Sequence, residues 1–146
     1  MSNTLYLLIA GSRDYDNYEE FSDILESTIE RIPHDDIEIV SGGARGADRL
    51  AERYAEEHGL IMRVFYADWE TDGKRAGILR NIKMQDYIKD KPNRACLCFW
   101  DGESRGTQSN FKMATERNTP LYVYNYTTRH MNVRKNLEKN DFGVHV

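Results

Sequence analysis

Five short apolar runs, each of four to six residues, alternate along this chain with stretches in which apolar residues recur every three or four positions. The runs are rich in β-branched and aromatic residues and are bounded by turn residues, which is typical of buried strands. No two-residue hairpin turn joins one run to the next, so consecutive strands need helical crossovers and lie parallel. The sequence therefore predicts a Rossmann-like three-layer α/β/α fold with a mainly parallel five-stranded sheet. The predicted strands are residues 5–10, 37–40, 61–66, 95–100 and 121–126.

The stretches between these runs predict four helices, each with one buried face. At the start of the first helix, Asn17 and Glu20 have the spacing of a capping box. Gly59 follows the second helix and suits a left-handed C-terminal cap. The predicted helices cover about residues 21–32, 50–55, 79–87 and 107–117.

The length of 146 residues matches one domain, and 40% hydrophobic with 30% charged residues is close to globular averages. We expect residues 1–126 to form the Rossmann-like core and residues 127–146 to be a C-terminal extension of the same domain. That extension is polar and weakly periodic. Because chain ends are commonly mobile, mobility is favoured over docking on a partner subunit.

Composition and sequence patterns limit the expected cellular location of the protein and the classes of partner it can bind. No apolar run approaches the roughly 18 residues of a membrane span, and no signal-peptide pattern opens the chain, so we expect a cytoplasmic protein without a membrane partner. Cys96 and Cys98 are expected to be buried reduced thiols. The four histidines lack metal-site spacing, and neither a metal nor a cofactor is expected. A net charge of −4 disfavours nucleic acid as a partner, whereas a homo-oligomer is left open.

The loops after the first, second and fourth predicted strands each combine glycine, a hydroxyl group and arginine. Ligands of open parallel sheets bind beyond the carboxyl ends of the strands, where these loops lie. Glycines let the backbone approach a ligand, and amides at a helix start favour an anion. These loops therefore predict a phosphate-binding cradle. Its expected residues are Gly11, Ser12, Arg13, Ser41, Gly42, Gly43, Arg45, Gly46, Asp48, Gly102, Ser104, Gly106 and Thr107.

Further candidate binding residues follow the third and fourth strands: Asp68, Trp69, Lys74, Arg80, Asn81, Trp100 and Asp101. Either tryptophan could stack on a base or simply pack in the protein. Seven cations gather near the predicted binding edge: Arg13, Arg45, Arg49, Lys74, Arg75, Arg80 and Arg105. A basic mouth on an acidic protein suits a small anionic ligand better than a duplex. Arginines at positions 45, 49 and 53 could instead pair with acids three residues further on, along a solvated helix.

Several motifs together resemble the YspA-like, YpsA-related branch of the SLOG superfamily. They comprise Gly11-Ser12-Arg13, the run from Ser41 to Asp48, Ala67-Asp68-Trp69, Arg80-Asn81 and the run from Trp100 to Thr107. The resemblance spans roughly residues 5–126. It implies a Rossmann-like fold that binds a nucleotide or a nucleotide-derived ligand. The superfamily includes LOG-type phosphoribohydrolases, DprA proteins that process DNA, and sensor domains for nucleotide signals.

The LOG enzymes carry a Pro-Gly-Gly-x-Gly-Thr-x-x-Glu motif and an Arg-Lys pair that serve in cleavage of the N-glycosidic bond. By resemblance, Gly106-Thr107 matches the Gly-Thr of that motif, and its glutamate position falls on Asn110. The Arg-Lys pair corresponds to Arg80-Asn81. Since cleavage needs a carboxylate and Asn110 cannot ionise, hydrolysis is disfavoured. Candidate catalytic residues, if any, are Glu103, Asp101 and Arg80.

Three functions follow, in order of preference. The first is binding of a nucleotide-like small molecule, such as a nucleoside phosphate or an ADP-ribose-like ligand, by a sensor or sequestering module without enzymatic activity. The second is a nucleoside-monophosphate N-glycosidase, that is, a phosphoribohydrolase. The third is DprA-like binding of single-stranded nucleic acid, which the acidic balance disfavours because it needs a basic groove with interleaved aromatic residues.

Overall fold

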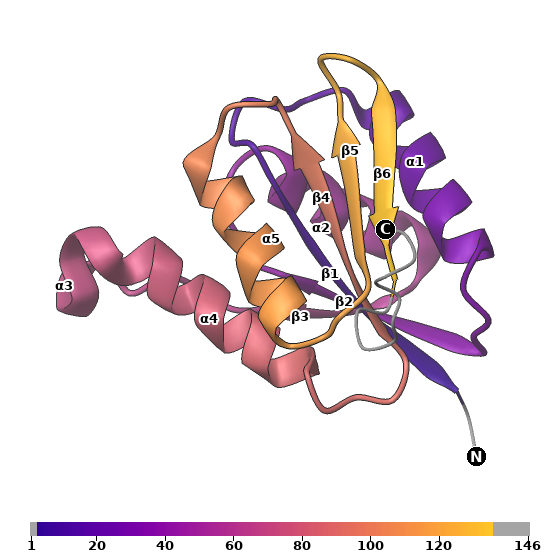
Figure 1. The fold of residues 1–146 in the computed structure, drawn as a ribbon, viewed down its shortest axis with the longest axis horizontal. Helices are drawn as coiled ribbons and strands as arrows, with labels where there is room; N and C mark the ends of the chain where they lie inside the picture. Colours follow the sequence, from indigo (N-terminus) through magenta and orange to yellow (C-terminus); the bar gives the residue numbers. More distant parts are fainter. Residues whose placement is uncertain (1–2, 136–146) are drawn as a thin grey trace, which may run out of the picture.

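The computed structural model describes residues 3–135 and contains one six-stranded sheet in the order β3-β2-β1-β4-β5-β6 (Figure 1). The first five strands are parallel, and β6 runs antiparallel to β5. The Rossmann-like α/β fold is therefore confirmed. The strand order reverses between β1 and β4. The strands are β1 (Thr4–Gly11), β2 (Asp36–Ser41), β3 (Ile61–Val64), β4 (Arg94–Trp100), β5 (Leu121–Asn125) and β6 (His130–Arg134).

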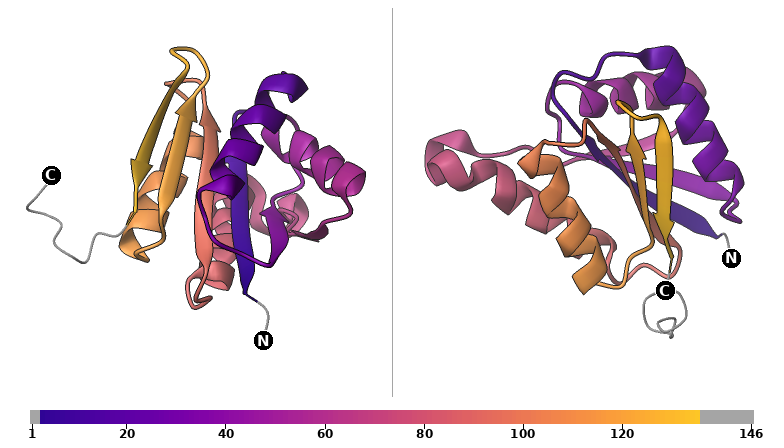
Figure 2. Two further views of the ribbon diagram at one scale, coloured as in Figure 1. Left: turned by 90° about the vertical axis from the view of Figure 1, so that its right-hand side faces the viewer. Right: turned by 45° about the horizontal axis from the view of Figure 1, so that its top comes forward.

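Helices cover both faces of the sheet, as Figures 1 and 2 show. Leu7 and Ile9 of β1 belong to the same buried cluster as residues of α1 and α2, whereas Leu8 between them packs with residues of α4 and α5. Both faces of β1 are therefore buried, which explains why its sequence is continuously apolar. The helices are α1 (Tyr18–Glu30), α2 (Ala47–His58), α3 (Trp69–Asp72), the 3₁₀ turn η1 (Gly73–Arg75), α4 (Ala76–Ile88) and α5 (Arg105–Glu116).

The predicted helix ends are largely as expected. Asn17 Oδ1 accepts a hydrogen bond of 3.1 Å from the amide of Glu20 at the start of α1, and Gly59 ends α2 at φ 65°. The Glu20 carboxylate instead accepts hydrogen bonds of 2.8 Å from the hydroxyls of Tyr15 and Tyr124. Glu20 thereby links α1 to β5 across the protein.

The prediction of five strands and a mobile extension is wrong for residues 130–134, which form β6. In the turn before β6, Asn125 Oδ1 accepts hydrogen bonds from the amides of Thr127 and Thr128. Met131 and Val133 pack against the buried cluster beneath α1. This strand is polar at alternate positions because it lies at the sheet edge and buries one face, so its apolar content is low. The remainder of the predicted extension, residues 136–146, lies outside the described residues.

The segment formed by α3, η1 and the first turns of α4 projects away from the sheet (Figure 1 and the right view of Figure 2). It follows β3, which ends at Val64 although the apolar run continues through Tyr66. Within residues 3–135, no helix has the length and apolar character needed to cross a membrane.

Candidate functional site

A cavity of about 590 Å³, here called the main cavity, lies where the strand order reverses between β1 and β4. Its walls come from the loop after β1, the first turns of α4 and the beginning of α5. This position is the one at which open parallel sheets bind ligands, and the volume lies within the usual range of small-molecule sites. The predicted site residues that line it are Gly11, Ser12, Arg13, Asp48, Trp69, Lys74, Arg80, Asn81, Asp101, Ser104, Gly106 and Thr107.

A second cavity of about 410 Å³, here called the side cavity, adjoins the main cavity. The two share four lining residues, Arg13, Ala44, Trp69 and Arg80. Of the remaining predicted residues, the side cavity contains Gly42, Gly43 and Arg45. Most of the loop after β2 therefore faces the side cavity, whereas Ala44 of that loop and Arg13 of the loop after β1 line both cavities.

Arg80 of α4 lies at the boundary of the two cavities and is anchored by the protein itself. Its Nη1 donates a 2.6 Å hydrogen bond to the carbonyl of Gly42, and its Nε donates one of 2.9 Å to Asn81 Oδ1. Burial lowers the pKa of Arg80, against the attraction of Asp48, which raises it. The guanidinium stays charged at neutral pH because arginine titrates far above 7. Arg80 is thus a fixed cation that links α4 to the loop after β2.

Asp48 in the first turn of α2 is buried and turns its carboxylate back onto its own loop. Its Oδ2 accepts a hydrogen bond of 3.1 Å from the amide of Ala44. Burial raises the pKa of Asp48 to about 6, although the bond from Ala44 and the charge of Arg80 lower it. The Ala44 amide is therefore already paired with an acidic group of this chain. The loop after β4 leads to a second helix start, that of α5.

That loop is folded by Asp101, whose Oδ1 accepts hydrogen bonds from the amides of Glu103 (2.8 Å) and Ser104 (2.7 Å). These bonds lower the pKa of Asp101. The loop leads into α5, whose first residues line the main cavity. A Cβ built on Gly106 would meet nothing within 4 Å, so the backbone here is open to an incoming group. A helix start of this kind favours an anion.

Cations and an exposed indole face the same cavity. The Arg13 guanidinium lies over the Trp69 ring, 5.9 Å from its centroid, and Trp69 is 52% exposed. The cations that line the main cavity are Arg13, Lys74, Arg80 and Arg105, and the acids are Asp14, Asp48 and Asp101. Four cations face three acids, so the balance around the cavity is positive even though Asp48, with a pKa of about 6, is mostly ionised at neutral pH.

Six predicted residues line neither cavity: Ser41, Gly46, Asp68, Trp100, Gly102 and Glu103. Several of them hold the loops in place instead. Trp100 Nε1 donates a 3.0 Å hydrogen bond to the carbonyl of Ser104 and its ring packs edge-on against Phe111. Asp68 accepts a hydrogen bond from the amide of Thr71 and caps α3. Glu103 is exposed.

The structure adds lining residues that the sequence interpretation left out. The main cavity also contains Ala10, Asp14, Ala44, Gly77, Ile78, Met84, Arg105, Ser109 and Asn110, and the side cavity also contains Arg49, Tyr66 and Ala67. Arg49 and Arg105 were signalled by the clustering of cations near the helix starts. Tyr66, which is 74% exposed, was not predicted as a site residue because it continues an apolar run that predicts a strand.

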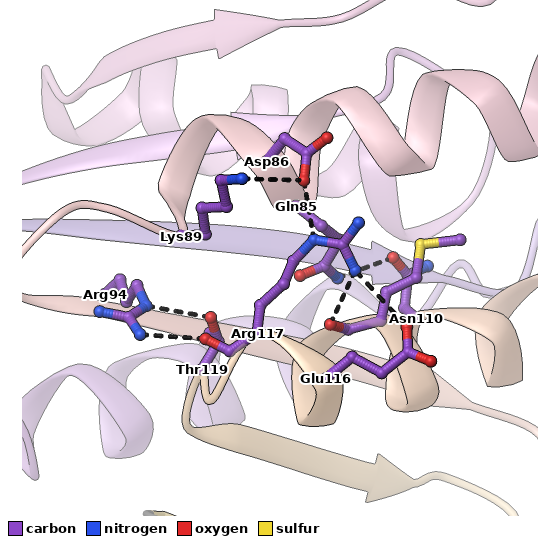
Figure 3. Close-up of polar contacts among 9 residues, drawn as sticks. Gln85, Asp86, Lys89, Arg94, Asn110, Glu116, Arg117 and Thr119 are labelled. Atoms are coloured by element: carbon purple, nitrogen blue, oxygen red, sulfur yellow. Dashed lines mark hydrogen bonds and ion pairs between the residues drawn. The ribbon is translucent and has the colours of Figure 1, made fainter.

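Asn110, at the position of the LOG glutamate, is 1% exposed and lies between α4 and α5 (Figure 3). Its Oδ1 accepts a hydrogen bond of 2.9 Å from Gln85 Nε2. Close by, Arg117 Nε of the segment after α5 donates a 2.8 Å hydrogen bond to Asp86 of α4. Asn110 thus belongs to a set of contacts that join the two helices. Among residues 3–135, no three potential metal ligands are grouped to hold an ion.

Comparison with known proteins supports the family resemblance. The family model described as the YspA, cpYpsA-related SLOG family matches residues 6–71, from β1 into α3. The Gene 61 protein of Mycobacterium phage D29 is 37% identical over 120 residues, which cover 79% of this chain and 92% of that protein. No solved structure matches. The chain therefore belongs to the YspA, cpYpsA-related SLOG family, which is associated with the binding or processing of nucleotide-related ligands.

Proposed function

We propose that the main cavity binds a nucleotide or nucleotide-derived ligand without cleaving it, so that the protein acts as a sensor or a sequestering module. One observation carries this proposal: four cationic side chains and the start of α5 surround a 590 Å³ cavity at the point where the strand order reverses. A phosphate is the anionic group that such a helix start and planar guanidinium groups recognise best.

The contacts support one orientation of the ligand. The phosphate lies at the start of α5, where Gly106 leaves the backbone open and Arg105 lies next to it. Arg13 is close enough to Trp69 for a cation–π contact, so a base stacked on the exposed indole would lie beside a cation. Asn81 is engaged by Arg80 at one atom, and its amide nitrogen remains a donor for a sugar or a base.

Binding without cleavage is favoured by the state of the three groups that could take the role of the LOG glutamate, Asn110, Asp101 and Glu103. Asn110 is uncharged, and its carbonyl oxygen is taken by Gln85. Asp101 is held ionised by two backbone amides that already occupy its Oδ1, and Glu103 lies outside the cavity. An oxocarbenium-like transition state needs a carboxylate that contacts the sugar or a water molecule. Neither Asn110 nor Glu103 meets that need, and Asp101 has one of its two carboxylate oxygens committed to the loop after β4.

Calorimetric titration with nucleoside mono-, di- and cyclic phosphates and with ADP-ribose tests the proposal. We expect saturable binding that Arg13→Ala weakens by about 1.5 to 3 kcal/mol, the usual worth of hydrogen bonds to charged groups. Arg53→Ala is a matched control, because Arg53 pairs with Glu57 on the exposed side of α2. Absence of binding across the panel, or equal loss in both variants, would contradict the proposal.

Prolonged incubation with the ligands that bind separates binding from hydrolysis. We expect no free base above the level of a protein-free sample. Release of base over multiple turnovers would establish the N-glycosidase function instead.

A further inference from the structure

The side cavity has the composition of a second anion-binding site. Four arginines line it, Arg13, Arg45, Arg49 and Arg80, and no aspartate or glutamate is among its described lining residues. A cavity of about 410 Å³ is large enough for a phosphate with a sugar or a base. The main cavity, in contrast, contains acids as well as cations.

Two of these arginines are available to a ligand. Arg45 and Arg49 are exposed, and within the described part of the chain neither forms an ion pair or a side-chain hydrogen bond. The pairing with acids three residues further on, which the sequence left open, is not formed. Arg53, one turn beyond Arg49 on α2, pairs with Glu57 at 3.0 Å. Of these three arginines, the two without an ion pair are therefore the two that line the side cavity.

The side cavity also has an aromatic surface of its own. Tyr66, just beyond β3, is 74% exposed and lies against the loop after β2, since a Cβ built on Gly43 would be 2.7 Å from its ring. Exposed tyrosines and tryptophans are the usual stacking surfaces for bases. In the main cavity, Trp69 thus lies beside the cation of Arg13. In the side cavity, Tyr66 is accompanied by Arg45 and Arg49.

The cavities adjoin, because Arg13, Ala44, Trp69 and Arg80 line both. One molecule can therefore occupy the two together. We propose that the ligand of this protein is a dinucleotide, with one phosphate at the start of α5 in the main cavity and the second nucleotide, bearing its own phosphate, held by Arg45 and Arg49 in the side cavity. This inference rests on the proposed function. A mononucleotide would leave the second set of cations without a partner.

The test compares a nucleoside 5′-monophosphate with the corresponding 5′-phosphorylated dinucleotide, in adenosine and guanosine series, by calorimetric titration. We expect the dinucleotide of one series to bind about tenfold or more tightly than its monophosphate. The double variant Arg45→Gln, Arg49→Gln should lower dinucleotide affinity to that of the monophosphate and leave monophosphate affinity unchanged. Arg53→Gln, the control on the same helix, should alter neither.

Three results would overturn the inference, and they differ from failure of the proposed function. Equal affinity of the wild-type protein for the two ligands would remove the side cavity from the site. Equal weakening of both ligands by the double variant would instead assign Arg45 and Arg49 to the mononucleotide, and either result leaves nucleotide binding intact. Tighter binding of a ten-residue oligonucleotide than of the dinucleotide would make single-stranded nucleic acid the ligand. Binding of neither ligand would overturn this inference, and it would overturn the proposed function as well only if the full nucleotide panel also failed to bind.

Discussion

Asp48 gives stability a dependence on pH that can be worked out from its surroundings. Burial raises its pKa to about 6 in the folded protein, whereas an exposed aspartate titrates near 4. Between these values the folded state binds more protons than the unfolded state, so the stabilisation present below about pH 4 is lost as pH rises to about 6. At about 1.4 kcal/mol per pKa unit, the loss is on the order of 3 kcal/mol.

Asp48→Asn removes this titration while keeping an oxygen for the Ala44 amide. We expect the difference in unfolding free energy, wild type minus variant, to fall between pH 4 and 6 and to be constant above that. Urea denaturation at four pH values measures it. A difference that is flat, or that rises with pH, would show that the folded protein does not raise the pKa of this carboxylate.

Gly42→Ala tests Arg80 without removing its charge. A Cβ at Gly42 would lie 2.6 Å from Arg80 Nη1, so the guanidinium must leave the Gly42 carbonyl. We expect ligand affinity to fall severalfold and the unfolding free energy to change by about 1 kcal/mol or less, the worth of one hydrogen bond. Arg80→Ala is less selective, because it also removes the cation whose charge lowers the pKa of buried Asp48.

Titration calorimetry and a denaturant melt on the same variant measure both quantities. Gly77→Ala is the control for a methyl group added to the cavity wall, since its Cβ would lie 3.6 Å from Trp69, an ordinary contact distance. Unchanged affinity in Gly42→Ala would remove Arg80 from the ligand contacts.

Among the elements, the start of α2 depends on one glycine. Gly46 has φ 75° and ψ −131°, and a Cβ there would lie 2.1 Å from the carbonyl oxygen of Ser12. Gly46→Ala therefore combines backbone strain with a clash against the loop after β1, and we expect a loss of more than about 2 kcal/mol of unfolding free energy. Gly59→Ala, at φ 65° with no neighbour within 4 Å, should cost only about 1 to 2 kcal/mol. Urea melts measure both losses of unfolding free energy. Equal losses in the two variants would show that a methyl group at position 46 does not clash with the loop after β1.

The pairing of α4 with α5 gives a further prediction, from the buried amides shown in Figure 3. Asn110→Asp places a carboxylate at a side chain that is 1% exposed. Its charged form is disfavoured by burial, so we expect the variant to be destabilised by a few kcal/mol at pH 8 and by less at pH 5. Urea melts of variant and wild type at both pH values measure the difference. Equal destabilisation at the two values would mean that the new carboxylate reaches water.

At the scale of the whole molecule, local sequence determined more of the fold than of the site. Apolar runs predict the largely buried strands β1, β2, β4 and β5, and also the edge strand β3, whose residues are mostly apolar. They miss β6, because that edge strand is polar at alternate positions and has too few apolar residues to form a run. The loops that face the main cavity could be predicted, since glycine and arginine after a strand have a local chemical signature. The side cavity could not, because Arg49 and Tyr66 come together only through the order of the strands.

The pairing of β1 with β4 also determines when during synthesis the candidate ligand site is completed. The ribosome completes β1, β2 and β3 long before residues 94–100 exist, and chains fold from the amino end as they emerge. Until β4 arrives, one edge of β1 offers its backbone groups to any other nascent strand. A message truncated after α4 would therefore yield an aggregation-prone half-sheet, and the wall of the candidate site formed by α5, whose lining extends to Asn110, would not be complete before about three-quarters of the chain had been translated.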